Sequence, residues 1–284
     1  MDRTLTVLHV SDLQCGAPYL PRAAEAMVGV FDTVQPDLVV ASGDLTQRAK
    51  VREFGLAREV LNRFSGVPVV VTPGNHDVPL YRFWERILIP FRNWRAFAGP
   101  DLDTVLRLEG AVVVALNSAA PRRAIINGRI DPDQVAFARR AFADAPTGDR
   151  RILVVHHHFV PVPTGEGSHP LPHAERWARA FGEMGVDVVL GGHVHQLHFG
   201  SLAGVPFLAT GTATSRRGRG VETGWNSLCV HRLVGGRVRV TPYRRAPDAD
   251  AFEELDMVEF PLGRSGRVAR VDEAAEAPMR GGHR

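Results

Sequence analysis

The chain has 284 residues, of which 44% are hydrophobic, so it is long enough to bury the core of one large domain. Its formal net charge is +3, from 34 basic and 31 acidic residues, and this small, dispersed excess argues against a nucleic-acid-binding surface. The two cysteines, Cys15 and Cys229, lie far apart in strand-like surroundings, which argues against a disulfide framework and favours a reducing compartment. No apolar stretch reaches the ~18 residues of a membrane span and the N-terminus lacks a signal core, so we expect a cytoplasmic protein.

Apolar segments of strand type alternate with helical patterns along much of the chain. We expect strands at residues 5–10, 38–41, 67–71, 104–108, 111–117, 152–155 and 188–190. Apolar residues recur at three- and four-residue spacing over residues 22–34, 51–64, 131–143 and 174–184, which we predict to be helices. This alternation predicts an α/β domain, in which functional residues gather where the strands end.

Beyond residue 191 the helical patterns stop and the chain continues as short strands. We expect these near residue 198 and at 206–209, 227–233 and 237–243, separated by glycine-rich turns such as Gly235-Gly236. From about residue 246 the composition shifts to Ala, Asp, Glu, Arg and Gly, and from about residue 263 it has too little apolar surface to fold. We therefore predict one domain over residues 1–245 and a C-terminal extension over residues 246–284, disordered from about residue 263.

Residue types that bind metals follow most of the predicted strands. They form five motifs: Asp12-Leu13-Gln14, Gly43-Asp44, Gly74-Asn75-His76-Asp77, His156-His157-His158 and Gly192-His193-Val194-His195. Taken singly, an aspartate before a turn is more often a turn or cap residue than a ligand. Five motifs at the ends of strands reverse that expectation, so we predict a metal centre at one edge of the sheet.

The donor types favour two transition-metal ions. Carboxylates, amide oxygens and neutral imidazoles suit Mn, Fe or Zn, whereas a magnesium site uses mostly carboxylates and water. The two oxygens of Asp44 can bridge ions about 3.5 to 4 Å apart, as in two-metal hydrolytic sites. Water shared by two such ions loses a proton near neutral pH, which yields the hydroxide that a phosphoester needs as nucleophile.

The ordered motifs resemble those of the calcineurin-like metallophosphoesterase superfamily, and within it the bacterial class III cyclic-nucleotide phosphodiesterases. The resemblance spans residues 5 to about 243, with the motifs in family order and at family-like spacing. It implies a four-layer αββα sandwich, an α/β fold in which two mixed β-sheets are flanked by helices and the metal site lies at the strand ends. It also implies two divalent metal ions as cofactors and a small-molecule phosphoester as substrate.

The same resemblance implies a role for each motif residue. One ion would be held by Asp12, Gln14, Asp44 and His195, and the other by Asp44, Asn75, His156 and His193. His76 would contact the phosphate and stabilise or protonate the leaving oxygen, with Asp77 orienting its ring. Only the first histidine of the triple matches a family ligand, so His157 is a candidate to face the substrate, to support the ligands from behind, or to be merely structural.

Gln14 departs from the family pattern, which usually has histidine at this position. A neutral amide oxygen is a weaker donor that shifts the first site toward harder ions, so we expect Mn, with Fe or Zn as alternatives. The Asp-x-Gln form is similar to that of the manganese-dependent ADP-ribose/CDP-alcohol diphosphatases. This departure leaves the choice between a cyclic nucleotide and a diphosphate open.

Residues 81–97 place aromatic and aliphatic side chains among arginines, directly after the motif that contains His76. One interpretation is a core helix with a basic outer face. The other is a cap over the metals, in which Arg82 and Arg86 bind phosphate and the aromatic side chains meet a base, an acyl chain or a peripheral membrane surface. Arg217, in the glycine-rich segment 216–220, is a further candidate for a substrate contact, although most such runs are solvated loops.

Three functions are consistent with these observations. The first is a phosphodiesterase, acting for example on a 3′,5′-cyclic nucleotide. The second is a pyrophosphatase for a nucleoside-diphosphate-linked substrate of the UDP-2,3-diacylglucosamine or ADP-ribose type, and the third is an inactive metal-binding module, which only Gln14 favours. A dinucleotide-binding domain is excluded, because Ser11-Asp12-Leu13-Gln14 follows the first strand in place of a Gly-x-Gly-x-x-Gly turn.

Overall fold

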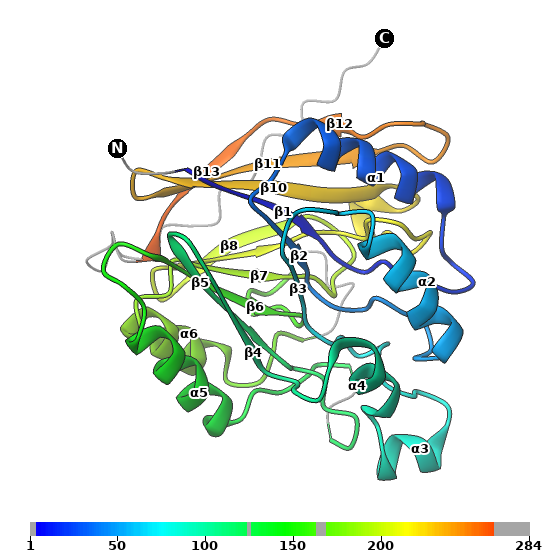
Figure 1. Cartoon of the computed structure of the whole chain (residues 1–284), viewed down its shortest axis with the longest axis horizontal. Helices are drawn as coiled ribbons and strands as arrows, with labels where there is room; N and C mark the ends of the chain where they lie inside the picture. The colour runs from blue at the N-terminus through cyan, green and yellow to red at the C-terminus, as the bar shows by residue number, and fades with distance from the viewer. Residues whose placement is uncertain (1–3, 124–125, 163–168, 264–284) are drawn as a thin grey trace.

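The computed structural model describes residues 4–123, 126–162 and 169–263, which form two β-sheets stacked face to face between helices (Figure 1). This arrangement confirms the four-layer α/β sandwich expected from the motifs. Within the described ranges, no helix is both long enough and apolar enough to span a lipid bilayer.

The first sheet has seven strands among the described residues, in the order β12-β11-β10-β1-β2-β3, with β13 also pairing with β11. Their bounds are Leu5–Val10 (β1), Leu38–Ala41 (β2), Val69–Val71 (β3), Asn226–Val234 (β10), Arg237–Arg245 (β11), Glu253–Glu254 (β12) and Val258–Pro261 (β13). β1, β2 and β3 are parallel, whereas β10 is antiparallel to β1, so the sheet is mixed as expected.

The second sheet has the order β4-β5-β6-β7-β9-β8 in the described part of the chain. Its strands are Thr104–Leu108 (β4), Ala111–Leu116 (β5), Arg150–Val155 (β6), Val188–Gly191 (β7), His198–Leu202 (β8) and Val205–Ala209 (β9). The four inner strands are parallel and the two edge strands, β4 and β8, are antiparallel to their neighbours. The parallel strands of both sheets therefore end in loops that can meet.

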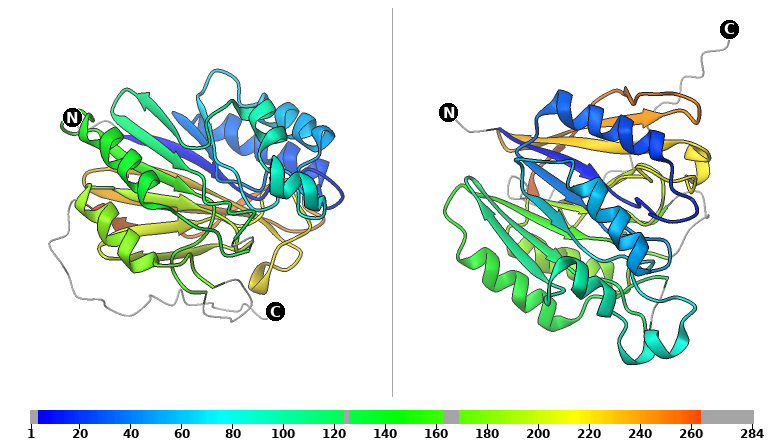
Figure 2. Two further views of the ribbon diagram at one scale, coloured as in Figure 1. Left: turned by 90° about the horizontal axis from the view of Figure 1, so that it is seen from below. Right: turned by 45° about the vertical axis from the view of Figure 1, so that its right-hand side comes forward.

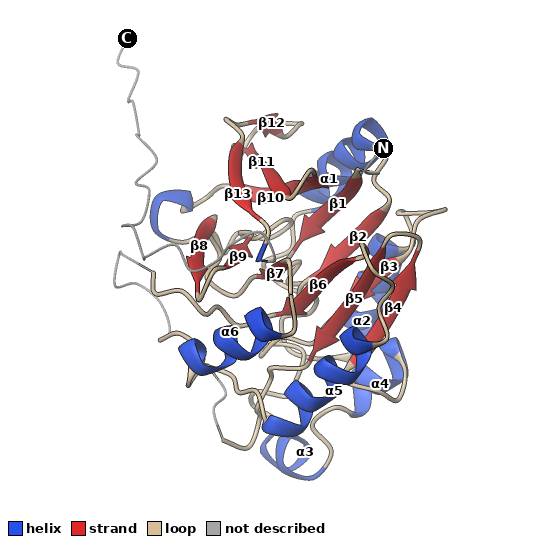
Figure 3. Cartoon of the chain, turned by 90° about the vertical axis from the view of Figure 1, so that its left-hand side faces the viewer, coloured by secondary structure: helices blue, strands red, loops and turns tan. Residues whose placement is uncertain are grey.

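Helices cover the outer face of each sheet (Figure 1 and Figure 3). The first sheet carries α1 (Pro21–Val34) and α2 (Val51–Leu61), and the second carries α5 (Pro132–Ala143) and α6 (Ala174–Glu183). Two of these helices begin with proline in the first turn, where its missing N–H costs nothing. α5 is also held by a capping box, in which Asp131 and the side chain of Gln134 satisfy each other's backbone N–H groups.

Apolar residues form three layers of core, one between the sheets and one under each pair of helices. β1 shows how the alternation of strand side chains supplies two of these layers. Leu5 and Val7 belong to the core between the sheets, whereas Leu8 and Val10 belong to the core beneath α1 and α2. Each such side chain, when fully buried, stabilises the fold by about 1.5–3 kcal/mol.

Residues 81–97 form two short helices with different environments, α3 (Phe83–Leu88) and α4 (Arg92–Ala98), which project at one corner (Figure 2). Trp94 of α4 is buried against Phe54 and Phe97, so the core-helix interpretation applies to α4. α3 buries none of its residues. The interpretation of the whole segment as one core helix is therefore wrong, because it does not hold for α3.

The predicted boundary at residue 245 also needs correction. β12 and β13 lie beyond it and pair with β11, and Phe252 and Leu262 are buried. The described part of the predicted extension, up to residue 263, therefore belongs to the first sheet. The prediction of disorder concerns residues 264–284, which lie outside the described residues.

Candidate metal centre

The seven predicted metal ligands lie in loops that leave the strands of both sheets. Asp12 and Gln14 follow β1, Asp44 follows β2, Asn75 follows β3, His156 follows β6, and His193 and His195 follow β7. All seven are buried. Because these strands end near one another, residues distant in the sequence come into contact, as when the backbone N–H of His193 donates to Oδ2 of Asp12 at 2.9 Å.

Five of these ligands adopt a backbone conformation that favours glycine. Their φ angles are 52° for Asp12, 51° for Gln14, 51° for Asp44, 75° for His193 and 57° for His195. Among the described residues, nine non-glycine residues have positive φ, so predicted ligands make up more than half of them. Such conformations are costly and cluster at functional sites, so this concentration supports a functional role for the loops.

The donor atoms have the spacing of groups that share an ion. Nε2 of His195 lies 3.1 Å from Oδ1 of Asp12, and Nε2 of His156 lies 3.4 Å from Oδ1 of Asp44. Two donors that are each ~2.1 Å from one ion are roughly 3 to 3.4 Å apart in octahedral or tetrahedral geometry. In addition, Asp12, Asp44 and His195 each offer one ligand atom within 4.8 Å of the other two.

Three buried ligand atoms have no hydrogen-bond partner among the described residues, namely Oδ1 of Asp12, Oδ1 of Asn75 and Nε2 of His156. Leaving a buried polar atom without a partner costs about 1–3 kcal/mol, and bound cations would satisfy all three atoms. The buried carboxylates, imidazoles and amides therefore fit divalent ions chemically. The division of the ligands between two ions stays a prediction.

Hydrogen bonds behind the ligands orient them toward the cluster. The ring Nδ1–H of His156 donates to the carbonyl of Ser42 at 2.7 Å, and that of His195 donates to the carbonyl of Arg217 at 2.7 Å. Both rings thus present Nε2, as metal-bound histidines do when the other nitrogen is held by a carbonyl. Oδ2 of Asp12 accepts from the hydroxyl of Ser11 at 2.7 Å, which leaves Oδ1 toward His195. The two carbonyl partners could not be predicted from the sequence, because every residue type supplies a backbone carbonyl.

The electrostatics of the cluster keep the carboxylates ionised. Burial opposes the charge on Asp44, but His156 and His76 outweigh it and hold the Asp44 pKa well below its usual value. Burial also opposes a charge on His156, yet Asp44 and Asp12 raise its pKa to about 9. For His193, burial and the neighbouring His157 lower the pKa well below 6.5, so this ring is neutral and ready to bind a metal.

Arg217 enters the cluster, as its candidacy for a substrate contact requires. Its Nη1 donates to Oε1 of Gln14 at 3.0 Å and lies 2.9 Å from Nε2 of His76. The Gln14 amide nitrogen in turn donates to Oδ2 of Asp44 at 3.0 Å. A ligand role for Gln14 requires its oxygen to face the ion, and this role stays a prediction.

The expectation that Asp77 orients the ring of His76 is wrong. The Nδ1–H of His76 donates instead to the carbonyl of Gln47 at 2.9 Å. The carboxylate of Asp77 is buried and accepts from the backbone N–H groups of Leu45, Thr46 and Gly74 at 2.8–3.1 Å. Asp77 therefore shapes the loop that carries Asp44, and burial together with Asp44 raises its pKa to about 7.

The guanidinium groups of Arg82 and Arg86, predicted as phosphate contacts, instead bind backbone carbonyls. The guanidinium of Arg82 donates to the carbonyls of Arg48 and Ala49 at 2.9 and 3.0 Å, and that of Arg86 donates to the carbonyl of Leu80 at 2.9 Å. These bonds count against both residues as phosphate contacts. His157 is buried behind the cluster, with Nδ1 bonded to Ser118 Oγ at 2.7 Å and its ring centroid 4.5 Å from that of His193, which favours the supporting role over a substrate contact.

Comparisons of the sequence and structure with known proteins agree with this geometry. A probable cyclic nucleotide phosphodiesterase of Psychrobacter sp. (strain PRwf-1) is 28% identical over 189 residues, which are 63% of this chain and 52% of the relative. One from Rhodococcus erythropolis is 27% identical over 215 residues, which are 72% of this chain and 66% of the relative. The chain thus spans about half to two thirds of the lengths of these relatives.

Solved structures share the fold at low sequence identity. The purple acid phosphatase PPD1 of yellow lupin superposes with a TM-score of 0.64 at 12% identity, over 92% of this chain and 54% of that protein. A dimetal phosphatase of Danio rerio also superposes with a TM-score of 0.64 at 12% identity, over 90% of this chain and 98% of that protein. Residues 5–197 match the calcineurin-like phosphoesterase family. With its motifs, its two packed sheets and this match over most of its length, the chain belongs to the calcineurin-like phosphoesterase family.

Proposed function

We propose that this chain is a metal-dependent phosphoesterase that hydrolyses a phosphodiester, with a 3′,5′-cyclic nucleotide as its substrate. Calcineurin-like phosphoesterases use two divalent metal ions, and the buried ligand cluster of this chain fits such a pair. The substrate class rests on the relatives, both of which are named probable cyclic nucleotide phosphodiesterases.

The position of Asp44 carries this proposal. Its Oδ1 lies 3.4 Å from Nε2 of His156, and the same carboxylate belongs to the cluster with Asp12 and His195. A carboxylate between two groups of donors is suited to bridging a pair of ions. When bound, the ions would supply an activated water and neutralise the charge of the phosphate.

The residues beside the cluster would bind the phosphate. Arg217 uses Nη1 for Gln14 and His76, while its Nε and Nη2 make no hydrogen bond to another described residue. These two N–H groups can donate together to phosphate oxygens, a geometry in which arginine binds more specifically than lysine. Arg217 is therefore the side chain that we assign to the substrate phosphate.

His76 lies beside that phosphate position and would act on the leaving group. Burial lowers its pKa, and Arg217 lowers it further against the opposing effect of Asp44, so the ring is mainly neutral at neutral pH. The Nδ1–H is taken by Gln47, and Nε2 accepts from Arg217. This arrangement favours stabilisation of the leaving oxygen through the His76–Arg217 pair over direct proton donation by a charged imidazole.

A comparison of substrates tests the proposal. Chelator-treated protein is reloaded with Mn²⁺ and assayed against 3′,5′-cyclic AMP, bis(p-nitrophenyl) phosphate and ADP-ribose. We expect the highest kcat/KM with the cyclic nucleotide and a loss of about 10³-fold in Asp44→Asn, because charge stabilisation by metal is worth several kcal/mol. Asp133→Asn, an exposed residue in the first turn of α5, serves as the matched control. Protein with two bound ions that hydrolyses none of the three esters would refute the proposal.

One observation favours a nucleoside-diphosphate-linked substrate as the second candidate. Arg48 and Arg219 lie close enough to Arg217 to lower its pKa, after burial and against the opposing effect of Asp44. Three arginines at one side of the cluster could bind a second phosphate. A higher kcat/KM for ADP-ribose than for cyclic AMP, lost on replacing Arg48 and Arg219 with alanine, would favour this diphosphatase over the phosphodiesterase.

A further inference from the structure

Large apolar side chains are exposed along one nine-residue segment at α3. The exposed fractions are 73% for Tyr81, 53% for Phe83, 73% for Trp84, 67% for Leu88 and 45% for Ile89. These five make up half of the large hydrophobic residues that are exposed in the described part of the chain. We call them the α3 patch, and exposed apolar side chains concentrated in this way mark an interaction site more often than an unused surface.

The backbone that carries the α3 patch is fixed to the domain. Arg82 donates to the carbonyls of Arg48 and Ala49, and Nε of Arg122 donates to the carbonyl of Ile87 at 2.7 Å. Tyr81 additionally packs under Arg48, with the guanidinium 4.3 Å from the ring centroid. These bonds hold α3 with its apolar side chains turned outward.

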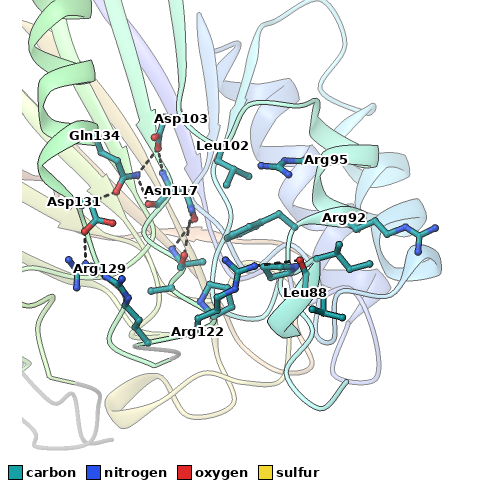
Figure 4. A pocket seen from close by; sticks show the side chains of 17 residues that line it. Leu88, Arg92, Arg95, Leu102, Asp103, Asn117, Arg122, Arg129, Asp131 and Gln134 are labelled. Atoms are coloured by element: carbon teal, nitrogen blue, oxygen red, sulfur yellow. Dashed lines mark hydrogen bonds and ion pairs between the residues drawn. The ribbon is translucent and has the colours of Figure 1, made fainter. Parts of the chain in front are cut away.

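Arginines surround a hollow that adjoins the patch (Figure 4). The hollow has a volume of about 890 Å³, and Leu88 and Ile89 of the patch form part of its wall. Five arginines line it, Arg92, Arg95, Arg122, Arg123 and Arg129, and we call the first four the arginine rim. All four are exposed, and neither Arg92 nor Arg123 has a side-chain hydrogen bond to another described residue.

The acidic residues of the same hollow do not neutralise the arginine rim. Asp103 accepts hydrogen bonds from the backbone of Asn117 and the side chain of Gln134, both at 2.8 Å. Asp131 pairs with a different arginine, Arg129. The surface next to the α3 patch therefore has unneutralised positive charge.

We propose that the α3 patch and the arginine rim dock this protein onto an anionic phospholipid bilayer. Aromatic side chains with arginines beside them suit the interfacial region of a membrane, where apolar rings enter the headgroups and arginines meet lipid phosphates. A second copy of the chain is a poorer occupant, because a two-fold interface would bring one arginine rim close to another. This inference goes beyond the proposed phosphoesterase activity and does not depend on it.

Vesicle binding by the metal-loaded, full-length protein tests the proposal. Co-sedimentation is compared for vesicles of phosphatidylcholine alone and of phosphatidylcholine mixed with phosphatidylglycerol, at low and high salt. We expect binding to the anionic vesicles and its loss at high salt, since exposed charges are screened within about 10 Å at 0.1 M salt. Binding should also shift Trp84 fluorescence to the blue, because Trp94 and Trp177 are already buried and Trp225 is half-buried beneath Arg244.

Substitutions in the α3 patch and the arginine rim test whether vesicle binding occurs through this surface. Trp84→Ala and Leu88→Ala should each weaken partitioning by about tenfold, the effect of withdrawing one large apolar side chain. Arg92→Glu and Arg123→Glu should each weaken it by about fivefold or more. Trp84→Phe should keep most of the binding but lose the fluorescence shift. Met257→Ala and Arg140→Glu, both at exposed residues elsewhere, are the matched controls for apolar and charged changes.

Three outcomes would overturn the proposal. The first is absence of binding to anionic vesicles by protein that is folded by circular dichroism. The second is binding that the α3 and rim variants leave unchanged. The third is concentration-dependent dimerisation by light scattering that Trp84→Ala abolishes, which would assign the patch to a second copy of this chain.

Discussion

Gln14 and Arg217, 203 residues apart in the sequence, are joined by a 3.0 Å hydrogen bond from the guanidinium to the amide oxygen. The same amide donates to Asp44, so one side chain connects the arginine with the candidate bridging carboxylate. A histidine at position 14 would place a ring that can become charged beside Arg217, and the neutral amide avoids this repulsion. Gln14, which departs from the family pattern, and Arg217 thus form one hydrogen-bonded arrangement.

Gln14→His should change the choice of metal. An imidazole nitrogen is a softer donor than an amide oxygen, so we expect the preference to move from Mn toward Fe or Zn while hydrolysis of a model diester persists. Metal competition followed by elemental analysis measures the preference. Gln35→His, at the C-terminal cap of α1, is the control. An unchanged metal profile would show that Gln14 does not act at the ion.

Arg217→Met should impair phosphate binding while both ions stay bound. Loss of a charged hydrogen-bond donor is worth about 1.5–3 kcal/mol, which predicts a roughly 10- to 100-fold fall in kcat/KM. Arg217→Lys should recover only part of the activity, because it restores the charge but not the planar pair of donors. Arg216→Met removes the neighbouring guanidinium, which donates to the carbonyl of Ala17, and serves as control. Loss of metal in Arg217→Met would instead indicate a role in building the site.

Metal affinity should increase with pH. Burial disfavours the charged ring of His156, but Asp44 and Asp12 raise its pKa to about 9, so in the metal-free protein this ring is protonated at neutral pH. An ion must displace that proton, and we expect affinity to rise by about tenfold per pH unit between about pH 6 and 8. Calorimetric titration in two buffers of different ionisation enthalpy measures the proton released. An affinity independent of pH would contradict this expectation.

Gly74→Ala should disrupt the metal centre without unfolding the domain. A Cβ atom at Gly74 would lie 2.1 Å from Oδ1 of Asp44 and 2.4 Å from its backbone nitrogen, so the carboxylate must move. We expect loss of bound metal with a destabilisation of about 1–3 kcal/mol from overpacking. Gly29→Ala, on α1 with nothing beyond the local helix backbone within 4 Å of the new Cβ, should retain metal. Full metal occupancy in Gly74→Ala would show that the loop can relax.

A buried histidine pair should make stability fall in acid. Nδ1 of His9 lies 3.1 Å from Nε2 of His231, and burial lowers both pKa values, that of His231 to about 3. The unfolded chain binds protons below about pH 6.5 whereas the folded His231 binds one only near pH 3, so stability is lost as pH falls between these values. The slope for one ring is about 1.4 kcal/mol per pH unit.

His231→Asn should reduce this slope by about that amount, because the amide does not titrate. Urea unfolding of metal-free protein at several pH values measures it, and chelation keeps metal release out of the comparison. An equal slope in both proteins would mean that the His9–His231 pair titrates normally in the folded state.

Most of the fold could be predicted because its strands are short apolar runs that end in polar residues. β1, β2 and β4 have the predicted bounds, and the other long elements differ by a few residues. One residue of the segment 81–97 predicts its division into α3 and α4, although the aromatic content of the segment favours a single helix. Pro90 disfavours helical backbone at Ile89, which has φ −140° and ψ 52° and separates α3 from α4.

The contacts of the site were less predictable, because they depend on tertiary packing. Asp12 and Asp44 each follow a strand, which predicts that they lie at the same edge of the sheet. Their residue types predict metal binding. Whether Asp77 faces His76 or the backbone of Thr46 is decided by the path of a loop 31 residues away. The reach of Arg217 to Gln14 likewise follows from how the segment after β9 folds back over the cluster.

β12 and β13, the two short strands at the C-terminal end of the described chain, protect the edge of the first sheet. β11 is nine residues long and, without β12 and β13, would present its outer backbone groups as a template for a strand of another molecule. β13 covers Arg237 to Val240 and β12 covers Tyr243 and Arg244. A chain shortened to residue 245 would keep every predicted metal ligand and yet be prone to aggregate through this uncovered strand.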